Sequence, residues 1–166
     1  MAIICRLFEL PADLAQRLDG TTGRLTEVVS AATVHGDVYR YWHAVEYLLT
    51  RHAPTQSTAR WLQSGTAVSA ASGQIPPARL LSPEEVIELD RLVRGIAPDD
   101  LIAHYDAAAL DAAAVYPGTW REWEETFDPL GQVLEHYSFL QFRAQSCAAA
   151  GNSLLLVFDE LAEGAV

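Results

Sequence analysis

Residues 153–158 read SLLLVF, a serine followed by five apolar residues, and they come directly after Gly151 and Asn152. Such a short apolar run is typical of a strand covered on both faces, while Gly-Asn is a common stop for a preceding helix. Near the other end of the chain, residues 2–10 read AIICRLFEL and also predict a buried strand. We expect the two terminal strands to pair in a small, mainly antiparallel sheet.

The residues between these strands favour helices, so we predict an α+β fold in which several helices pack against the sheet. A short middle strand is expected near residues 78–81. Helical spacing and end signals place helices at 11–18, 25–32, 37–51, around Trp61, 82–95, 98–105, 106–116, 120–127 and 129–150.

The helix that follows residue 82 has a complete set of end signals. Ser82 is suited to the N-cap, Pro83 to the first helical position, and Glu85, three residues after the cap, to the reciprocal bond of a capping box. Gly95 is the expected stop. This helix is therefore predicted from local chemistry alone.

The segment 37–51, DVYRYWHAVEYLLTR, is interpreted as one helix. Its apolar residues recur at helical spacing, at Val38, Tyr41, Trp42, Val45, Leu48 and Leu49. Four polar residues beside that stripe are spaced by four, three and four and are expected on one face: Tyr39, His43, Glu46 and Thr50. A His-Glu pair in a cleft could act as general acid or base, and the alternative is the polar border of a packed helix.

The formal net charge of −11 is concentrated in one part of the chain. Residues 82–128 hold three arginines and twelve acidic residues, a net charge of −9. An acidic surface repels a phosphate backbone and attracts a basic protein, so we expect a basic protein partner and no nucleic acid. The alternative is a set of solvated helix faces whose acids keep the protein soluble.

Several kinds of chemistry are disfavoured by the residues that the chain lacks. All eleven basic residues are arginine, which excludes lysine Schiff bases and the lysine of a phosphate-binding loop. Neither a GxSxG nor an HExxH motif occurs. The remaining histidines, His35, His52, His104 and His136, are scattered among different predicted elements, so we expect no metal and no cofactor.

The sequence also favours a cytoplasmic location. The N-terminal residues fail as a secretory signal because charged residues interrupt a short apolar run, and no later run is long enough for a membrane span. Cys5 and Cys147 are far apart in the chain and are interpreted as buried thiols.

Three stretches resemble the YfbM-like family, a bacterial domain family of unknown function. They are the residues Asp37, Arg40, Trp42, His43, Tyr47, Leu48, Leu49 and Thr50, then ARLLSPEEV at 78–86, and then HYDAAALDAAAVYPGTW at 104–120. The resemblance implies an α+β domain of this family. The chain length suits a single domain, expected at residues 1–158, and the acidic residues 159–166 are interpreted as a tail. The resemblance implies no activity, because none is established for the family.

A group of aromatic and acidic residues remains as a candidate binding surface, with core packing as the alternative: Tyr47, Tyr105, Tyr116, Trp120, Trp123, Glu122 and Glu125. The leading hypothesis is a non-enzymatic protein-binding domain of the inhibitor or immunity type. A small enzyme or small-molecule receptor with a pocket around His43, Glu46 and Tyr116 is the alternative, and a homodimer is a third. Residues 53–82 are the expected mobile region, and whether residues 53–77 form a lid is left open.

Overall fold

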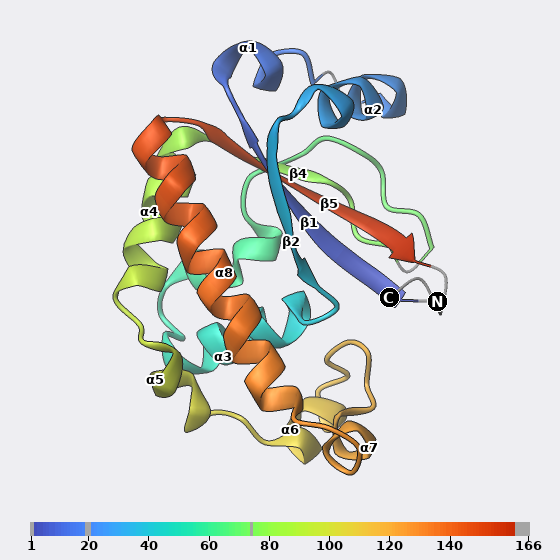
Figure 1. Cartoon of the computed structure of the whole chain (residues 1–166), viewed down its shortest axis with the longest axis vertical. Helices are drawn as coiled ribbons and strands as arrows, with labels where there is room; N and C mark the ends of the chain where they lie inside the picture. The colour runs from blue at the N-terminus through green and yellow to red at the C-terminus, as the bar shows by residue number, and fades with distance from the viewer. Residues whose placement is uncertain (1, 19–20, 74, 162–166) are drawn as a thin grey trace.

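The computed structural model describes residues 2–18, 21–73 and 75–161, and in these ranges five strands form one antiparallel sheet (Figure 1). The strand order is β2-β1-β5-β4-β3, which confirms the predicted α+β class. In chain order the elements are β1 (Ala2–Leu10), α1 (Ala12–Ala15), α2 (Thr22–Ala31), β2 (Val34–Tyr39), α3 (Trp42–His52), the 3-10 helix η1 (Ser57–Gln63), β3 (Thr66–Ala67), β4 (Arg79–Leu81), α4 (Pro83–Arg94), α5 (Pro98–Ile102), α6 (Ala107–Ala112), α7 (Trp120–Glu124), α8 (Pro129–Ala150) and β5 (Ser153–Leu161).

The two terminal strands pair along their whole length, as predicted. Ala2 lies opposite Leu161 and Leu10 lies opposite Ser153. Strand β5 is longer than the apolar run suggests, so residues 159–161 of the expected acidic tail belong to the sheet. Residues 162–166 of that tail lie outside the described residues.

Both faces of the central strands are covered, as the apolar run predicts, because alternate side chains point to opposite faces. One face packs against α3, α4 and α8 through Ile3, Cys5, Leu7, Leu154, Leu156 and Phe158. The other face packs beneath α1, α2 and the segment that leads to β4, through Phe8, Leu10, Leu155 and Val157. The β1–β5 pair therefore forms the middle layer of the fold.

The prediction of one helix over residues 37–51 is wrong at its start. Residues Val34–Tyr39 form the edge strand β2, which pairs with β1, and the helix begins only at Trp42. Tyr39 has a positive φ of 49°, where the chain turns from the strand toward the helix. Pairing with β1 overrides the helical spacing of Val38, which is fully buried in the sheet.

The predicted ends of the two long helices are confirmed. The Ser82 hydroxyl accepts a bond from the Glu85 N–H at 3.3 Å, and the Glu85 carboxylate accepts one from the Ser82 N–H at 2.8 Å. Helix α8 ends at Gly151, whose φ of 66° is the left-handed conformation that glycine adopts without strain.

Helix α8 is attached to the sheet edge by one charged side chain and one close contact. The Arg143 guanidinium lies 3.3 Å from the buried Glu9 carboxylate and donates to the His35 carbonyl at 3.0 Å. The Phe139 ring packs directly on Gly36, where an added Cβ would lie 2.1 Å from the ring. These contacts hold the helical layer against β1 and β2.

Helices α5, α6 and α7 gather at one end of the molecule, and α1 and α2 lie at the opposite end (Figure 1). The first group is short and closely connected, and α7 packs on both α6 and α8. Most acidic residues of the middle of the chain therefore lie on one end of the fold.

Candidate functional site

His43 and Tyr116 hold the α6–α7 connection against α3 and the first strand. The His43 Nδ1 accepts a hydrogen bond from the Tyr116 N–H at 3.0 Å, and burial lowers the pKa of His43, which keeps the ring neutral and able to accept. The Tyr116 hydroxyl accepts from the Ile3 N–H at 2.6 Å. The Trp42 ring stacks on both His43 and Tyr116 and donates to the Ile3 carbonyl. The contacts among these four residues therefore connect β1, α3 and the α6–α7 connection inside the fold.

Glu46 attaches η1 to α3. Its side chain is buried, and the carboxylate accepts hydrogen bonds from the Leu62 N–H at 2.8 Å and from the Gln63 amide at 3.4 Å. Burial raises the pKa of Glu46, and these bonds partly oppose that effect. The carboxylate therefore replaces a missing backbone partner for the Leu62 N–H.

The four polar side chains predicted on one face of the helix at residues 37–51 do not point toward a common site. Tyr39 belongs to β2, the Thr50 hydroxyl donates back to the Glu46 carbonyl, and His43 is bonded to Tyr116. The two hollows described below are lined by other residues. The geometry therefore favours the packed-helix interpretation of this row.

Two of the predicted aromatic residues are half-buried on the helical side of the fold. The Arg51 guanidinium lies over the Tyr47 ring, 5.6 Å from its centroid. Burial, and then the nearby Glu124 carboxylate, raises the pKa of Tyr105, so this hydroxyl stays protonated. Both rings pack against the core.

The two predicted tryptophans divide between core and surface. Trp120 is fully buried, and its Nε1 donates to the Val115 carbonyl at 2.9 Å. Trp123 is half-buried and contacts Trp120, Tyr41 and Phe127 in a ring cluster with centroid distances of 5.3 to 6.0 Å. Phe127 is 42% exposed, so this cluster reaches the surface.

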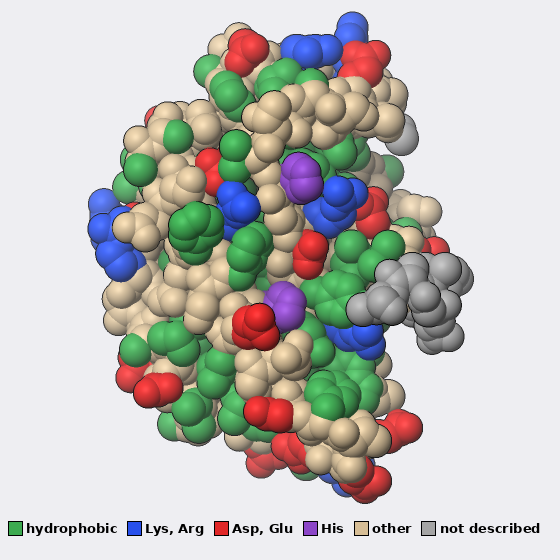
Figure 2. Space-filling view, viewed as in Figure 1, with side chains coloured by type: hydrophobic (Ala, Val, Ile, Leu, Met, Phe, Trp, Pro, Cys, Tyr) green, Lys and Arg blue, Asp and Glu red, His purple; other side chains and the backbone are tan. Residues whose placement is uncertain are grey.

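Beside this cluster the surface is strongly acidic. Residues 97–128 hold eight acidic residues and one arginine, a net charge of −7. Figure 2 shows acidic side chains gathered at the end of the molecule that α6 and α7 form. Several of these carboxylates are used inside the fold: those of Asp100, Asp106 and Asp128 each accept a backbone N–H at the start of a helix.

An open hollow of about 440 Å³ lies on this acidic end, and we refer to it as the acidic hollow. Burial alone would raise the pKa of Asp111, but the N–H groups of Trp120 and Arg121 and the Arg121 guanidinium outweigh it and lower that pKa. The hollow is lined by Asp111, Gly118, Thr119, Arg121, Glu122 and Glu125. The predicted residues Glu122 and Glu125 are thus brought together at one site.

Glu122 and Glu125 differ from Asp111, the third acidic residue that lines the hollow, because their carboxylates are exposed and make no polar contact with the described residues. Within residues 2–18, 21–73 and 75–161, neither forms a hydrogen bond or an ion pair, whereas Asp111 is paired with Arg121 at 3.4 Å. Two free carboxylates beside exposed aromatic surface are able to bind a cationic side chain.

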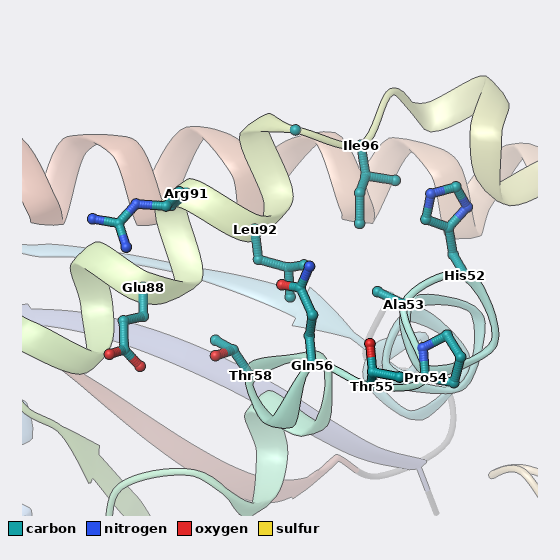
Figure 3. A pocket seen from close by; sticks show the side chains of 11 residues that line it. His52, Ala53, Pro54, Thr55, Gln56, Thr58, Glu88, Arg91, Leu92 and Ile96 are labelled. Atoms are coloured by element: carbon teal, nitrogen blue, oxygen red, sulfur yellow. The ribbon is translucent and has the colours of Figure 1, made fainter.

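A second, larger groove of about 600 Å³ lies between the end of α3, η1 and the second half of α4 (Figure 3). His52 lies at one end of it, Glu88 and Arg91 lie at the other, and Leu92 of α4 and Ile96, just after that helix, line one wall. Nothing in the sequence indicated this groove, because within each separate helix its residues follow the usual pattern of apolar residues on the buried face and polar residues on the exposed face. Only the packing of η1 against both α3 and α4 places them around one space.

The described ranges contain neither a metal centre with three or more side-chain ligands nor a helix able to span a membrane. No group of three or more His, Cys, Asp or Glu side chains has the arrangement of a metal centre there. Likewise, none of the described helices has the length and apolar character that crossing a bilayer requires.

Comparison with known proteins gives a family and a fold. The sequence pattern of a family described as a domain of unknown function, DUF1877, matches residues 1–157. The crystal structure of a protein of unknown function, YfbM from Escherichia coli, is similar, with a TM-score of 0.71 and 13% sequence identity over 94% of this chain and 99% of that chain. No curated protein matches the chain. At such low identity the structural likeness shows the fold alone.

Proposed function

Since the chain belongs to the DUF1877 family, the YfbM-like family that its motifs resemble, and that family name carries no activity, we propose a function from the surface. The proposed function is that of a cytoplasmic, non-enzymatic domain that binds a basic protein through the acidic hollow, as an inhibitor or immunity protein would. One observation carries the proposal: Glu122 and Glu125 are exposed at the most acidic end of the fold and have no hydrogen-bond or ion-pair partner among the residues that the structure describes.

The surroundings of the two glutamates support this proposal. Arg121, which lines the hollow, is paired with Asp111, so its positive charge is partly neutralised. Exposed Phe127 and half-buried Trp123 lie in the same segment and offer apolar contact area. An acidic rim beside aromatic anchors is a common arrangement at protein interfaces, where the charges guide association and the rings add affinity.

The alternative of a small enzyme or receptor with a pocket around His43, Glu46 and Tyr116 has less support. Each of these three groups is engaged by the protein itself: Glu46 joins α3 to η1, His43 joins α3 to the α6–α7 connection, and the Tyr116 hydroxyl joins that connection to β1. A catalytic acid or base must instead reach a substrate proton. The predicted homodimer stays a prediction.

A matched pair of variants tests the proposed function. The test variant is Glu122→Gln/Glu125→Gln, and the control is Asp13→Asn/Glu160→Gln, which changes the net charge equally at exposed positions elsewhere. Each immobilised protein captures partners from extract of its own host at about 50 mM and about 300 mM salt, and bound proteins are identified by mass spectrometry.

We expect a basic protein that wild type and control retain and that high salt releases. Its affinity for the test variant should be roughly two- to thirty-fold lower, the loss expected for two exposed ion pairs. The proposal fails if the captured protein binds both variants equally, or if wild type captures no basic protein at either salt concentration.

A further inference from the structure

His52, which lines one end of the groove shown in Figure 3, meets a second histidine, His104, from a different part of the chain. His52 is the last residue of α3, and His104 lies in the turn after α5. The Nδ1 of His52 and the Nε2 of His104 are 3.3 Å apart, and the two ring planes are inclined at 81°. The tertiary fold thus brings together residues that are 52 positions apart in the sequence.

This separation suits a shared metal ion as well as a hydrogen bond. Zinc binds imidazole nitrogen at about 2.0–2.1 Å, so two nitrogens on one tetrahedral ion lie about 3.3–3.4 Å apart. One ligand is the Nδ1 of its ring and the other is the Nε2, and both kinds of nitrogen bind metals. The distance alone does not choose between the two arrangements, so the surroundings matter.

The surroundings favour a cation. His52 is exposed and His104 is half-buried, so an ion can reach both rings. The 11-residue helix α3 ends at His52, and the C-terminus of a helix carries partial negative charge. Exposed Asp100 and Asp106 flank His104 in the chain, and the neighbouring Arg51 is turned onto the Tyr47 ring.

The side chains of the other described histidines make different contacts. The Nδ1 of His43 is used by the Tyr116 N–H, the Nδ1 of His136 is bonded to the Gln132 carbonyl, and His35 packs on the Phe8 ring. Among the described residues, only His52 and His104 turn their ring nitrogens toward another imidazole.

We propose that His52 and His104 form a two-imidazole binding site for a divalent transition-metal ion, zinc above all. Imidazole nitrogen suits zinc, copper and nickel, whereas calcium and magnesium prefer oxygen ligands. With two protein ligands the ion keeps open positions, which water or a donor group of a molecule in the groove fills. The bound ion links the end of α3 to the α5–α6 connection at the mouth of the groove.

Proton placement sets the conditions for binding. In the hydrogen-bonded pair one of the two facing nitrogens carries a proton, but a metal needs both as free lone pairs. The donating ring must therefore carry its proton on the other nitrogen, which is Nε2 for His52 or Nδ1 for His104.

The test uses the full chain with zinc chloride, followed by cobalt chloride as a spectroscopic probe. Thermal unfolding and calorimetric titration are compared for wild type, His52→Gln, His104→Gln and the control His35→Gln, which removes an exposed histidine outside the groove. Far-ultraviolet circular dichroism establishes that each variant is folded.

We expect zinc to raise the unfolding midpoint of wild type and control in proportion to the logarithm of its concentration. His52→Gln and His104→Gln should each bind zinc at least about tenfold more weakly than wild type. The visible absorption of protein-bound cobalt should be lost in the same two variants. The inference is overturned if wild type shows no binding, which leaves a hydrogen-bonded pair only, or if His52→Gln and His104→Gln bind as tightly as the control. Neither result depends on the acidic hollow or its partner.

Discussion

Replacing Arg143 with methionine should leave the Glu9 carboxylate buried without its cation and destabilise the fold severely. The two charged groups are 3.3 Å apart, and their side chains are only 16% and 4% exposed. At an effective dielectric constant of about 20, this separation corresponds to an attraction of about 5 kcal/mol. Methionine keeps most of the aliphatic stem of Arg143 but loses the guanidinium, which lies 5.2 Å from the Phe139 ring centroid, so the change removes the charge together with this cation–π contact.

The expected loss in the free energy of unfolding is about 3–5 kcal/mol, the usual cost of removing one partner of a buried pair. Urea unfolding followed by circular dichroism measures it, because a domain with about 5–15 kcal/mol of stability can tolerate such a loss and remain measurable. The control is Arg17→Met. Arg17 pairs with Glu27 at 3.6 Å, but both side chains are about half exposed, so we expect less than about 1 kcal/mol.

A double variant, compared with the two single variants Glu9→Gln and Arg143→Met, measures the interaction energy between the two side chains. Glu9→Gln/Arg143→Met removes both charges, so its loss should be smaller than the sum of the two single losses by about 2 kcal/mol or more. The reasoning is refuted if Arg143→Met costs no more than Arg17→Met, or if the two single losses simply add.

Three further predictions concern the packing of the fold. Gly36→Ala should lower the free energy of unfolding by about 1–3 kcal/mol in urea, because its Cβ would overlap the Phe139 ring, and Phe139→Leu in the same chain should recover part of that loss. Burial lowers the pKa of His43, so folding disfavours its protonated form; the stability of wild type relative to His43→Gln should decrease as the pH falls below about 6.5. Burial raises the pKa of Glu46, which gives the opposite slope: wild type should lose stability relative to Glu46→Gln as the pH rises from about 4 toward neutrality. Thermal melts from about pH 4 to about pH 8 test both slopes, and equal slopes for wild type and variant would contradict the corresponding assignment.

The candidate sites differ in how far local patterns could reveal them. The charge of the acidic end is visible in the sequence, and the structure adds that Glu122 and Glu125 line one hollow. The aromatic group divides, because Trp120 is enclosed in the core while Trp123 and its neighbours reach the surface. The polar row on α3 is dispersed, because Tyr39 belongs to a strand and Glu46 is drawn inward to the Leu62 N–H.

The sequence by itself determined the features that depend on near neighbours. The Ser82 capping box, the stop at Gly151 and the two buried terminal strands all follow from residues within a few positions of one another. In a strand made only of apolar residues, the side chains on both faces must be buried away from water. The presence of a packed layer on each side of β5 was therefore predictable from the sequence.

Only the tertiary structure decided which distant residues share a place. The start of the segment 37–51 became a strand because β1 offers backbone hydrogen bonds there, and no local spacing encodes that partner. His52 and His104 meet because α3 and α5 pack side by side. Local propensity acts over a few residues, whereas such contacts arise only when the whole chain buries its apolar surface at once.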